Sequence, residues 1–265
     1  MYKFGVLGVG KMGGAILGGI VNSRLYYKKD MLLSFRTIES SEPYKNKGFN
    51  VTTDPTVLFS NTRIILLAIK PQMFESVLGD SNKYDYTDKC IISIAAGIDI
   101  DYLENKFPNA TIVRAMPNTP SIINYGVTTI CSNKKNDLYN KALKILASIG
   151  SVYEIEEDEM NKTLPLNGSM PAYLMSFAKE FIKNGIDNGI DKELTKKLCV
   201  DTIISSAKLL EASDENIDIL ISNVCSRGGT TIAGLEKLYN AGFEQAIREC
   251  YKACYERANE LNTKW

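Results

Sequence analysis

The sequence predicts an N-terminal α/β domain with a mostly parallel sheet, followed by an all-α C-terminal domain. In residues 2–155, short apolar runs alternate with segments of helical spacing, a pattern typical of a doubly wound α/β domain. After the acidic stretch 154–159, strand signals become rare and long helical patterns dominate. The 265 residues are enough for two domains, which we predict to span 1–160 and 161–265.

Short runs in the first part predict strands over residues 2–7, 31–35, 63–68, 89–95, 111–116, 126–131 and 151–155. The runs 63–68 and 89–95 are continuously apolar and rich in Ile, which suits strands buried on both faces, as in a parallel sheet. Between them the spacing predicts helices over 12–21, 55–59 and 137–149. Asp54 and Pro55 suit the start of the second helix as N-cap and first helical residue, and Gly150 suits the end of the third.

Long helical patterns fill the second part, over residues 171–185, 191–212, 232–239 and 243–261. The last helix carries one apolar stripe, made of Phe243, Ile247, Cys250, Cys254, Ala258 and Leu261. An apolar stripe of this kind must be buried against another helix or another subunit. We therefore expect a helical domain that also forms a subunit interface, and so a homo-oligomer.

Composition excludes several classes of function. Lys and Arg total 31 and Asp and Glu total 31, so the net charge of zero argues against a nucleic-acid-binding protein. The chain has no histidine, which excludes Ser-His-Asp and Cys-His catalysis, HExxH metalloproteases and histidine-rich metal sites. We expect no metal site.

Cellular location is predicted from apolar segments and cysteines. No apolar run approaches the length of a membrane span, and the first residues show no signal-peptide pattern. The six cysteines form no CxxC pair and are expected to be reduced, mostly buried thiols of a cytoplasmic protein.

A G-x-G-x-x-G motif directly follows the first predicted strand and opens a helix. In this context Gly8 permits the tight turn, Gly10 lets the backbone approach a pyrophosphate, and Gly13 lets helix and strand pack closely. The unpaired N–H groups of the helix start would face the anion. The alternative is a purely structural turn. We predict a Rossmann-type dinucleotide-binding domain.

The end of the second strand predicts which dinucleotide is used. NAD-selective sites place a carboxylate there, but this chain has Ser34, Phe35, Arg36 and Thr37. Because an arginine beside hydroxyl groups suits a 2′-phosphate, Ser34 and Arg36 predict NADPH, with NADH as the alternative. The competing interpretation makes Arg36 a solvated surface residue.

A second glycine-rich helix start lies at residues 226–231, in the predicted helical domain. Two glycines and hydroxyl side chains before a helix form an anion-binding nest, and a small carboxylate is the expected ligand. An ordinary Ser/Thr-capped helix is the alternative.

The chain resembles the pyrroline-5-carboxylate reductase family over nearly its whole length. The similarity is carried by GVGKMG at 8–13, AIKPQ at 68–72, ISIAAGI at 92–98, RAMPNTP at 114–120, GSMPAY at 168–173 and GGTTIAGL at 228–235. The resemblance implies NAD(P)H-dependent reduction of 1-pyrroline-5-carboxylate to proline, the last step of proline biosynthesis. It also implies a Rossmann domain followed by an all-α dimerisation domain, with dimers that often assemble into decamers.

The resemblance also assigns roles to residues. Cofactor binding falls to Gly8, Val9, Gly10, Lys11, Met12 and Gly13, to Ala68, Ile69, Lys70 and Pro71, and to Ala95, Ala96 and Gly97 on the nicotinamide side. Residues 116–119 would form the sheet edge that faces the active site. Substrate binding falls to Ser226, Gly228, Gly229, Thr230 and Thr231, and Thr231 matches the hydroxyl nearest the ring nitrogen.

Some positions depart from the family pattern. The family usually has Pro at Arg227, Gly at Met170 and Asn at Lys11, and often acidic residues at Lys179 and Lys183; Pro165 is also uncommon. Together with the architecture shared by β-hydroxyacid dehydrogenases, these departures leave three alternatives open. The chain could reduce a related cyclic imine, act like a β-hydroxyacid dehydrogenase through Lys162 or Lys179, or be a non-catalytic nucleotide-binding regulator.

The absence of histidine agrees with the implied reaction. A cyclic imine is partly protonated near neutral pH, and its carbon is then already electrophilic. Hydride transfer therefore depends on positioning and charge complementarity more than on a strong acid. Thr231 would hydrogen-bond the ring nitrogen without supplying a proton of matched pKa.

Overall fold

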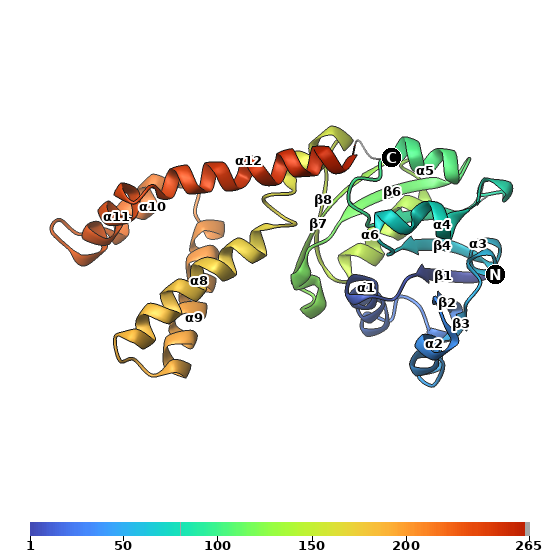
Figure 1. Cartoon of the computed structure of the whole chain (residues 1–265), viewed down its shortest axis with the longest axis horizontal. Coiled ribbons are helices and arrows are strands. Elements are labelled where there is room, and N and C mark those ends of the chain that lie inside the picture. Colours follow the sequence, from blue (N-terminus) through green and yellow to red (C-terminus); the bar gives the residue numbers. More distant parts are fainter. Residues whose placement is uncertain (80, 263–265) are drawn as a thin grey trace. The chain divides into compact units, whose positions relative to one another are not determined.

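The computed structural model describes residues 1–79 and 81–262 (Figure 1). The chain divides into two compact units. The first is Met1–Pro171 together with the C-terminal segment that begins at Cys254, and the second is Ala172–Ala253. The assignment of functions to 1–160 and 161–265 stays a prediction, because compactness alone does not show where each function lies.

A twisted sheet forms the centre of the first unit. Its strands, in the described residues, are β1 (Tyr2–Leu7), β2 (Met31–Ser34), β3 (Asn50–Thr52), β4 (Thr62–Leu67), β5 (Cys90–Ser93), β6 (Thr111–Met116), β7 (Gly126–Ser132) and β8 (Gly150–Glu154). Their order is β3-β2-β1-β4-β5-β6-β7-β8. Neighbours pair in parallel except β6 with β7. This confirms the predicted α/β fold with a mainly parallel sheet.

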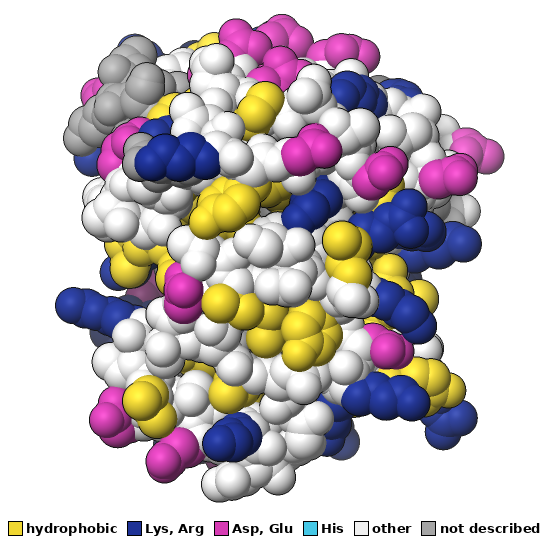
Figure 2. All heavy atoms as spheres, turned by 90° about the vertical axis from the view of Figure 1, so that its right-hand side faces the viewer, with side chains coloured by type: hydrophobic (Ala, Val, Ile, Leu, Met, Phe, Trp, Pro, Cys, Tyr) yellow, Lys and Arg dark blue, Asp and Glu magenta, His cyan; other side chains and the backbone are white. Residues whose placement is uncertain are grey.

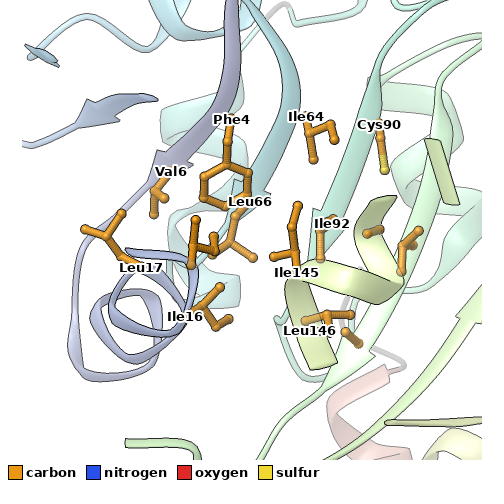
Figure 3. Packing of buried hydrophobic residues seen from close by; sticks show 14 of the residues in the cluster. Phe4, Val6, Ile16, Leu17, Ile64, Leu66, Cys90, Ile92, Ile145 and Leu146 are labelled. Atoms are coloured by element: carbon orange, nitrogen blue, oxygen red, sulfur yellow. The ribbon is translucent and has the colours of Figure 1, made fainter. Parts of the chain in front are cut away.

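Helices cover both faces of this sheet. They are α1 (Lys11–Asn22), α2 (Ile38–Lys45), α3 (Pro55–Asn61), α4 (Phe74–Leu78), α5 (Ile100–Lys106), α6 (Asp137–Ala147) and α7 (Met160–Thr163). On one face, strand residues such as Val6 and Leu66 point toward Ile16 of α1 and Ile145 of α6 (Figure 3). A second buried cluster covers the other face, under α3, α4 and α5. Strands β4 and β5 are therefore buried on both sides, as predicted.

All regular secondary structure of the second unit is helical. The helices are α8 (Met170–Asp187), α9 (Lys192–Ala212), α10 (Ile217–Val224), α11 (Thr230–Asn240) and α12 (Phe243–Asn262), of which α8 and α12 extend into the first unit. Among residues 172–253 only Thr195 is buried, while apolar side chains such as Phe181, Leu198 and Val224 are exposed. A single copy of this unit therefore has no closed apolar core.

The surface carries both signs of charge. On the face drawn in Figure 2, Lys and Arg side chains are interspersed with Asp and Glu, and hydrophobic side chains form small separate groups. Within the described part of the chain, no helix combines the length and apolar character needed to cross a membrane.

Three sequence expectations differ from the structure. The third predicted helix ends at Ala147, and Gly150 instead begins β8 with φ +143°, where an added Cβ would lie 1.9 Å from the carbonyl oxygen of Gly126. Glycine is needed there because the two strands start side by side. Only Cys90 and Cys131 are buried, so the prediction that the thiols are mostly buried is wrong for a single chain. All six cysteines are free thiols. The strand β3 and the helices α2, α4, α5, α7 and α10 were not predicted.

Candidate active site

The glycine loop after β1 is packed too closely for side chains at two positions. Gly8 has φ +89°, and a Cβ there would lie 2.7 Å from Cγ2 of Ile69. A Cβ at Gly13 would lie 2.5 Å from the carbonyl oxygen of Gly8 and 3.0 Å from Cβ of Ala68. The first turn of α1 thus lies directly against the loop and the end of β4.

The start of α1 is open to an anion. Gly10 is the N-cap, it makes no side-chain cap bond, and a Cβ built on it meets nothing within 4 Å. The N–H groups of a first helical turn lack intrahelical partners and carry the positive end of the helix dipole. The apolar Val9 and Met12 pack on the sheet core, whereas Lys11 is exposed and adds a positive charge beside the open turn.

The end of β2 presents one cation. Arg36 is exposed, and neighbouring Thr37 caps α2 by accepting from the Ser40 N–H. Ser34 is 2% exposed, and its hydroxyl has no partner among the described residues. Its carbonyl accepts the Gly8 N–H at 3.2 Å, so Ser34 links β2 to the glycine loop through its backbone.

The ends of β4 and β5 complete this edge of the sheet. Residues 68–71 leave β4, with the Ala68 N–H bonded to the Leu7 carbonyl at 2.9 Å and with Lys70 exposed before Pro71. Residues 95–97 leave β5, where the Ile94 N–H bonds to the Leu67 carbonyl at 3.2 Å. These loops and Gly8 therefore meet at the carboxyl ends of β1, β4 and β5. The strand order reverses between β1 and β4, which is where open α/β sheets bind ligands.

Two buried amides fix the next loop, residues 116–119. The Asn118 side chain donates to the Asn167 carbonyl at 2.9 Å and accepts the Val127 N–H at 2.9 Å. The Asn167 side chain donates to the Met116 carbonyl at 2.9 Å. No pattern in the sequence indicates Asn167, because its partners lie about fifty positions away along the chain.

The loop 226–231 has the geometry of an anion nest. Gly228 has φ +70°, and Gly229 is the N-cap of α11 without a side-chain cap bond. Its N–H bonds to the Ser226 carbonyl at 2.9 Å, and a Cβ at Gly229 would lie 2.2 Å from Oγ of Ser226. Thr230 and Thr231 form the exposed first turn. This loop belongs to the second unit, whereas the structure brings the cofactor residues together in the first.

Each of the two lysines considered for hydroxyacid chemistry lies beside an acidic side chain. Lys162 pairs with Asp158 at 2.5 Å, and this hydrogen bond raises the pKa of the ammonium group. Lys179 is exposed beside Glu180, with 3.7 Å between Nζ and Oε1. Within the residues that the structure describes, no group of His, Cys, Asp and Glu could hold a metal ion.

Comparison with known proteins agrees with this geometry. A family model described as pyrroline-5-carboxylate reductase dimerisation matches residues 157–261, and one described as NADP oxidoreductase, coenzyme F420-dependent, matches residues 3–97. A pyrroline-5-carboxylate reductase from Synechocystis is 32% identical over 270 residues, covering 99% of both chains. The chain belongs to the pyrroline-5-carboxylate reductase family.

Solved structures of this family also match over nearly the full length. The pyrroline carboxylate reductase of Plasmodium falciparum with NADP bound is 30% identical, with a TM-score of 0.89 and 98% of each chain covered. The Streptococcus pyogenes enzyme is 29% identical, with a TM-score of 0.87 and coverage of 97% of this chain and 98% of that one. The all-α domain is thus the dimerisation domain of the family, and the chain is a homo-oligomer-forming oxidoreductase.

Proposed function

We propose that this protein reduces 1-pyrroline-5-carboxylate to L-proline with NADPH as the hydride donor, the last step of proline biosynthesis. The observation that carries the proposal is the full-length similarity to curated pyrroline-5-carboxylate reductases, such as the Synechocystis protein at 32% identity. The glycine loop 8–13 at the sheet edge would bind the cofactor, and the nest at 226–231 would bind the substrate carboxylate.

The residues at the sheet edge fit a dinucleotide phosphate. A Cβ at Gly8 or Gly13 would collide with the chain itself, so these glycines let the first turn of α1 lie against the loop, and the open space at Gly10 suits the diphosphate. The loop 8–13, including Lys11, would hold the diphosphate. Arg36 would pair with the 2′-phosphate, and Ser34 would hold the glycine loop through its carbonyl. Residues 68–71 and 95–97 would line the cofactor, which supplies the hydride when bound.

The substrate is a small cyclic imine with one carboxylate. Ser226, Gly228, Gly229 and Thr230 would bind that carboxylate through hydroxyl and backbone N–H groups, which fixes the ring. Thr231 would hydrogen-bond the ring nitrogen. Because an iminium ion is already protonated, no histidine is needed, and positioning carries the catalysis.

The dimerisation domain indicates that the active enzyme is an assembly of several copies of the chain. Exposed apolar side chains on α8 and α9, such as Leu174, Phe181 and Leu198, need a cover that a second copy provides. We place the enzyme in the cytoplasm because its six cysteines are free thiols. Assembly of dimers into decamers is part of the same proposal.

The test is NADPH consumption by the purified protein with a panel of substrates. We expect turnover with pyrroline-5-carboxylate above that with piperideine-6-carboxylate, and none with hydroxy acids. Preference for the six-membered imine would assign a related reductase. NADPH binding without turnover on any compound would contradict the proposal and indicate a regulatory protein.

A further inference from the structure

An ion pair in the first unit joins a buried arginine to a partly exposed glutamate and is not used by the proposed reaction. Arg114, on β6, is 1% exposed, and its Nη1 lies 3.0 Å from Oε1 of Glu157. Its Nε and Nη2 are buried without a hydrogen-bond partner among the described residues. A buried arginine with two unfilled donors pays a desolvation cost that a single ion pair to the partly exposed Glu157 only partly offsets. Stability alone therefore does not account for this arginine.

The same carboxylate oxygen of Glu157 also holds the start of α5. It accepts the backbone N–H of Ile100, the first residue of that helix, at 2.8 Å. This N–H has no intrahelical partner, and a negative charge at a helix N-terminus is favourable. Arg114 thus fixes Glu157, and Glu157 fixes the point where the loop after β5 becomes a helix.

That loop contains residues 95–97 and is held at further points. At its beginning, the Ala95 N–H bonds to the Ser93 hydroxyl at 3.4 Å. In its middle, Gly97 has φ +78°, and a Cβ there would lie 2.9 Å from the carbonyl oxygen of Leu261 on α12. Glu157 supplies the restraint at the end of the loop. By register, Arg114 lies beside Ser93 on β5 and Cys131 on β7, directly under this part of the sheet edge.

We propose that Glu157, anchored by Arg114, is a positioning residue that holds loop 95–97 in the conformation that receives the nicotinamide end of the cofactor. This inference rests on the proposed function, because it takes residues 95–97 as part of the cofactor site. Glu157 acts through the Ile100 N–H and touches neither cofactor nor substrate. Its removal should therefore weaken cofactor binding while the substrate nest at 226–231 stays intact.

The decisive variant is Arg114→Met/Glu157→Leu, which removes both charges without leaving one of them buried and unpaired. We expect a melting temperature within a few degrees of the wild type, because the pair adds little stability and the lost bond to the Ile100 N–H costs about as much as a helix N-cap. The Kd of NADPH, measured by fluorescence titration, and the KM for NADPH should both rise about tenfold, since small displacements of a binding loop are costly. The KM for the imine and kcat should stay within about threefold.

Two further proteins separate positioning from a general structural effect. The single variant Arg114→Lys keeps the charge that anchors Glu157. Its Kd for NADPH should therefore stay within about threefold of wild type, unlike that of the double variant. Glu154→Gln breaks the exposed pair with Lys135, which are 2.7 Å apart near the same sheet edge, and should leave the Kd of NADPH unchanged.

The outcomes distinguish this inference from the proposed function. An unchanged Kd in the double variant, with an active wild type, would overturn the inference alone. Loss of kcat and both affinities in step with a lowered melting temperature would also overturn it, because that is the signature of a structural pair. A wild type that does not bind NADPH would overturn the proposed function and this inference together.

Discussion

Gly13 sits where the first turn of α1 touches the glycine loop. An added methyl group would lie 2.5 Å from the Gly8 carbonyl oxygen, a backbone atom that cannot rotate away. Gly13→Ala should therefore push the helix from the loop and raise the Kd of NADPH about tenfold or more, measured by fluorescence titration.

Gly14 provides the matched control, because it is the next residue and a Cβ there meets nothing within 4 Å. Gly14→Ala should leave the Kd unchanged and stabilise the helix by up to about 1 kcal/mol. Equal effects of the two substitutions on NADPH binding would contradict the role of Gly13 in packing α1 against the glycine loop 8–13.

Arg36 decides the choice of cofactor in this account. It is exposed at the end of β2, and an arginine there pairs with a 2′-phosphate that NADH lacks. Arg36→Ser should lower kcat/KM for NADPH about tenfold and leave kcat/KM for NADH nearly unchanged. Arg63→Ser is the control, since Arg63 is exposed near the amino end of β4, at the opposite edge of the sheet. If Arg36→Ser lowers both values equally, Arg36 is not the selecting residue.

At the residue scale, local motifs could be predicted and long-range partners could not. The glycines at 8, 10 and 13 are recognised because their spacing reflects one strand–turn–helix unit. The bonds of Asn118 with Asn167, and of Arg114 with Glu157, join residues more than forty positions apart, and no spacing in the sequence encodes them.

At the scale of elements, burial explains which helices and strands could be predicted. Strands such as β4 and β6 are continuous apolar runs because both faces are covered. The helix α2 is polar and contains Pro43, and α5 has seven residues, so neither shows an apolar stripe. The strand β3 has three half-buried residues and forms only because β2 offers it an edge.

Lys89 links two elements and gives a pH-dependent prediction. It is 7% exposed, and its ammonium group donates to the carbonyls of Phe59 and Ser60, near the C-terminus of α3. Lys89→Met should lower the free energy of unfolding by about 1–3 kcal/mol, because these carbonyls lose their partner. Lys141→Met, at an exposed position of α6, should change it little.

Burial lowers the pKa of Lys89 below its usual 10.5. Between the folded pKa and 10.5 the unfolded chain binds more protons than the folded one, so the wild type gains stability as the pH rises through this window. Urea unfolding of wild type and Lys89→Met at both ends of the window should show the difference in unfolding free energy increasing with pH. A difference that shrinks would contradict the direction of the shift.

At the scale of the whole molecule, the second unit depends on a partner. The rings of Phe177 and Phe181 on α8 contact each other in a tilted arrangement with centroids 4.8 Å apart, yet they are 42% and 58% exposed. Phe181→Asp places a charge in the proposed interface and should shift the protein toward monomers in size-exclusion chromatography with light scattering, with loss of activity.

Tyr27→Asp is the control, because Tyr27 is an aromatic residue of the first unit that is 68% exposed. It should leave the oligomeric state unchanged. A Phe181→Asp protein that keeps the mass of the wild-type assembly would contradict the assignment of α8 to the subunit interface.

The sequence predicted the all-α domain and its interface from long apolar stripes, but not how the chain divides. The stripe of α12 runs without a break from Phe243 to Leu261, whereas the compact units divide this helix at Cys254. A periodic pattern shows that a face must be covered. It does not show whether that face packs against the same unit, the other unit or a second copy of the chain.

Product formation from pyrroline-5-carboxylate with each cofactor tests the proposed reaction. We predict one L-proline formed for each NADPH oxidised, detected by chromatography, and a kcat/KM for NADPH at least about tenfold above that for NADH, as expected when a charged pair selects the cofactor. NADPH oxidation without proline, or no reaction with either cofactor, would contradict the account.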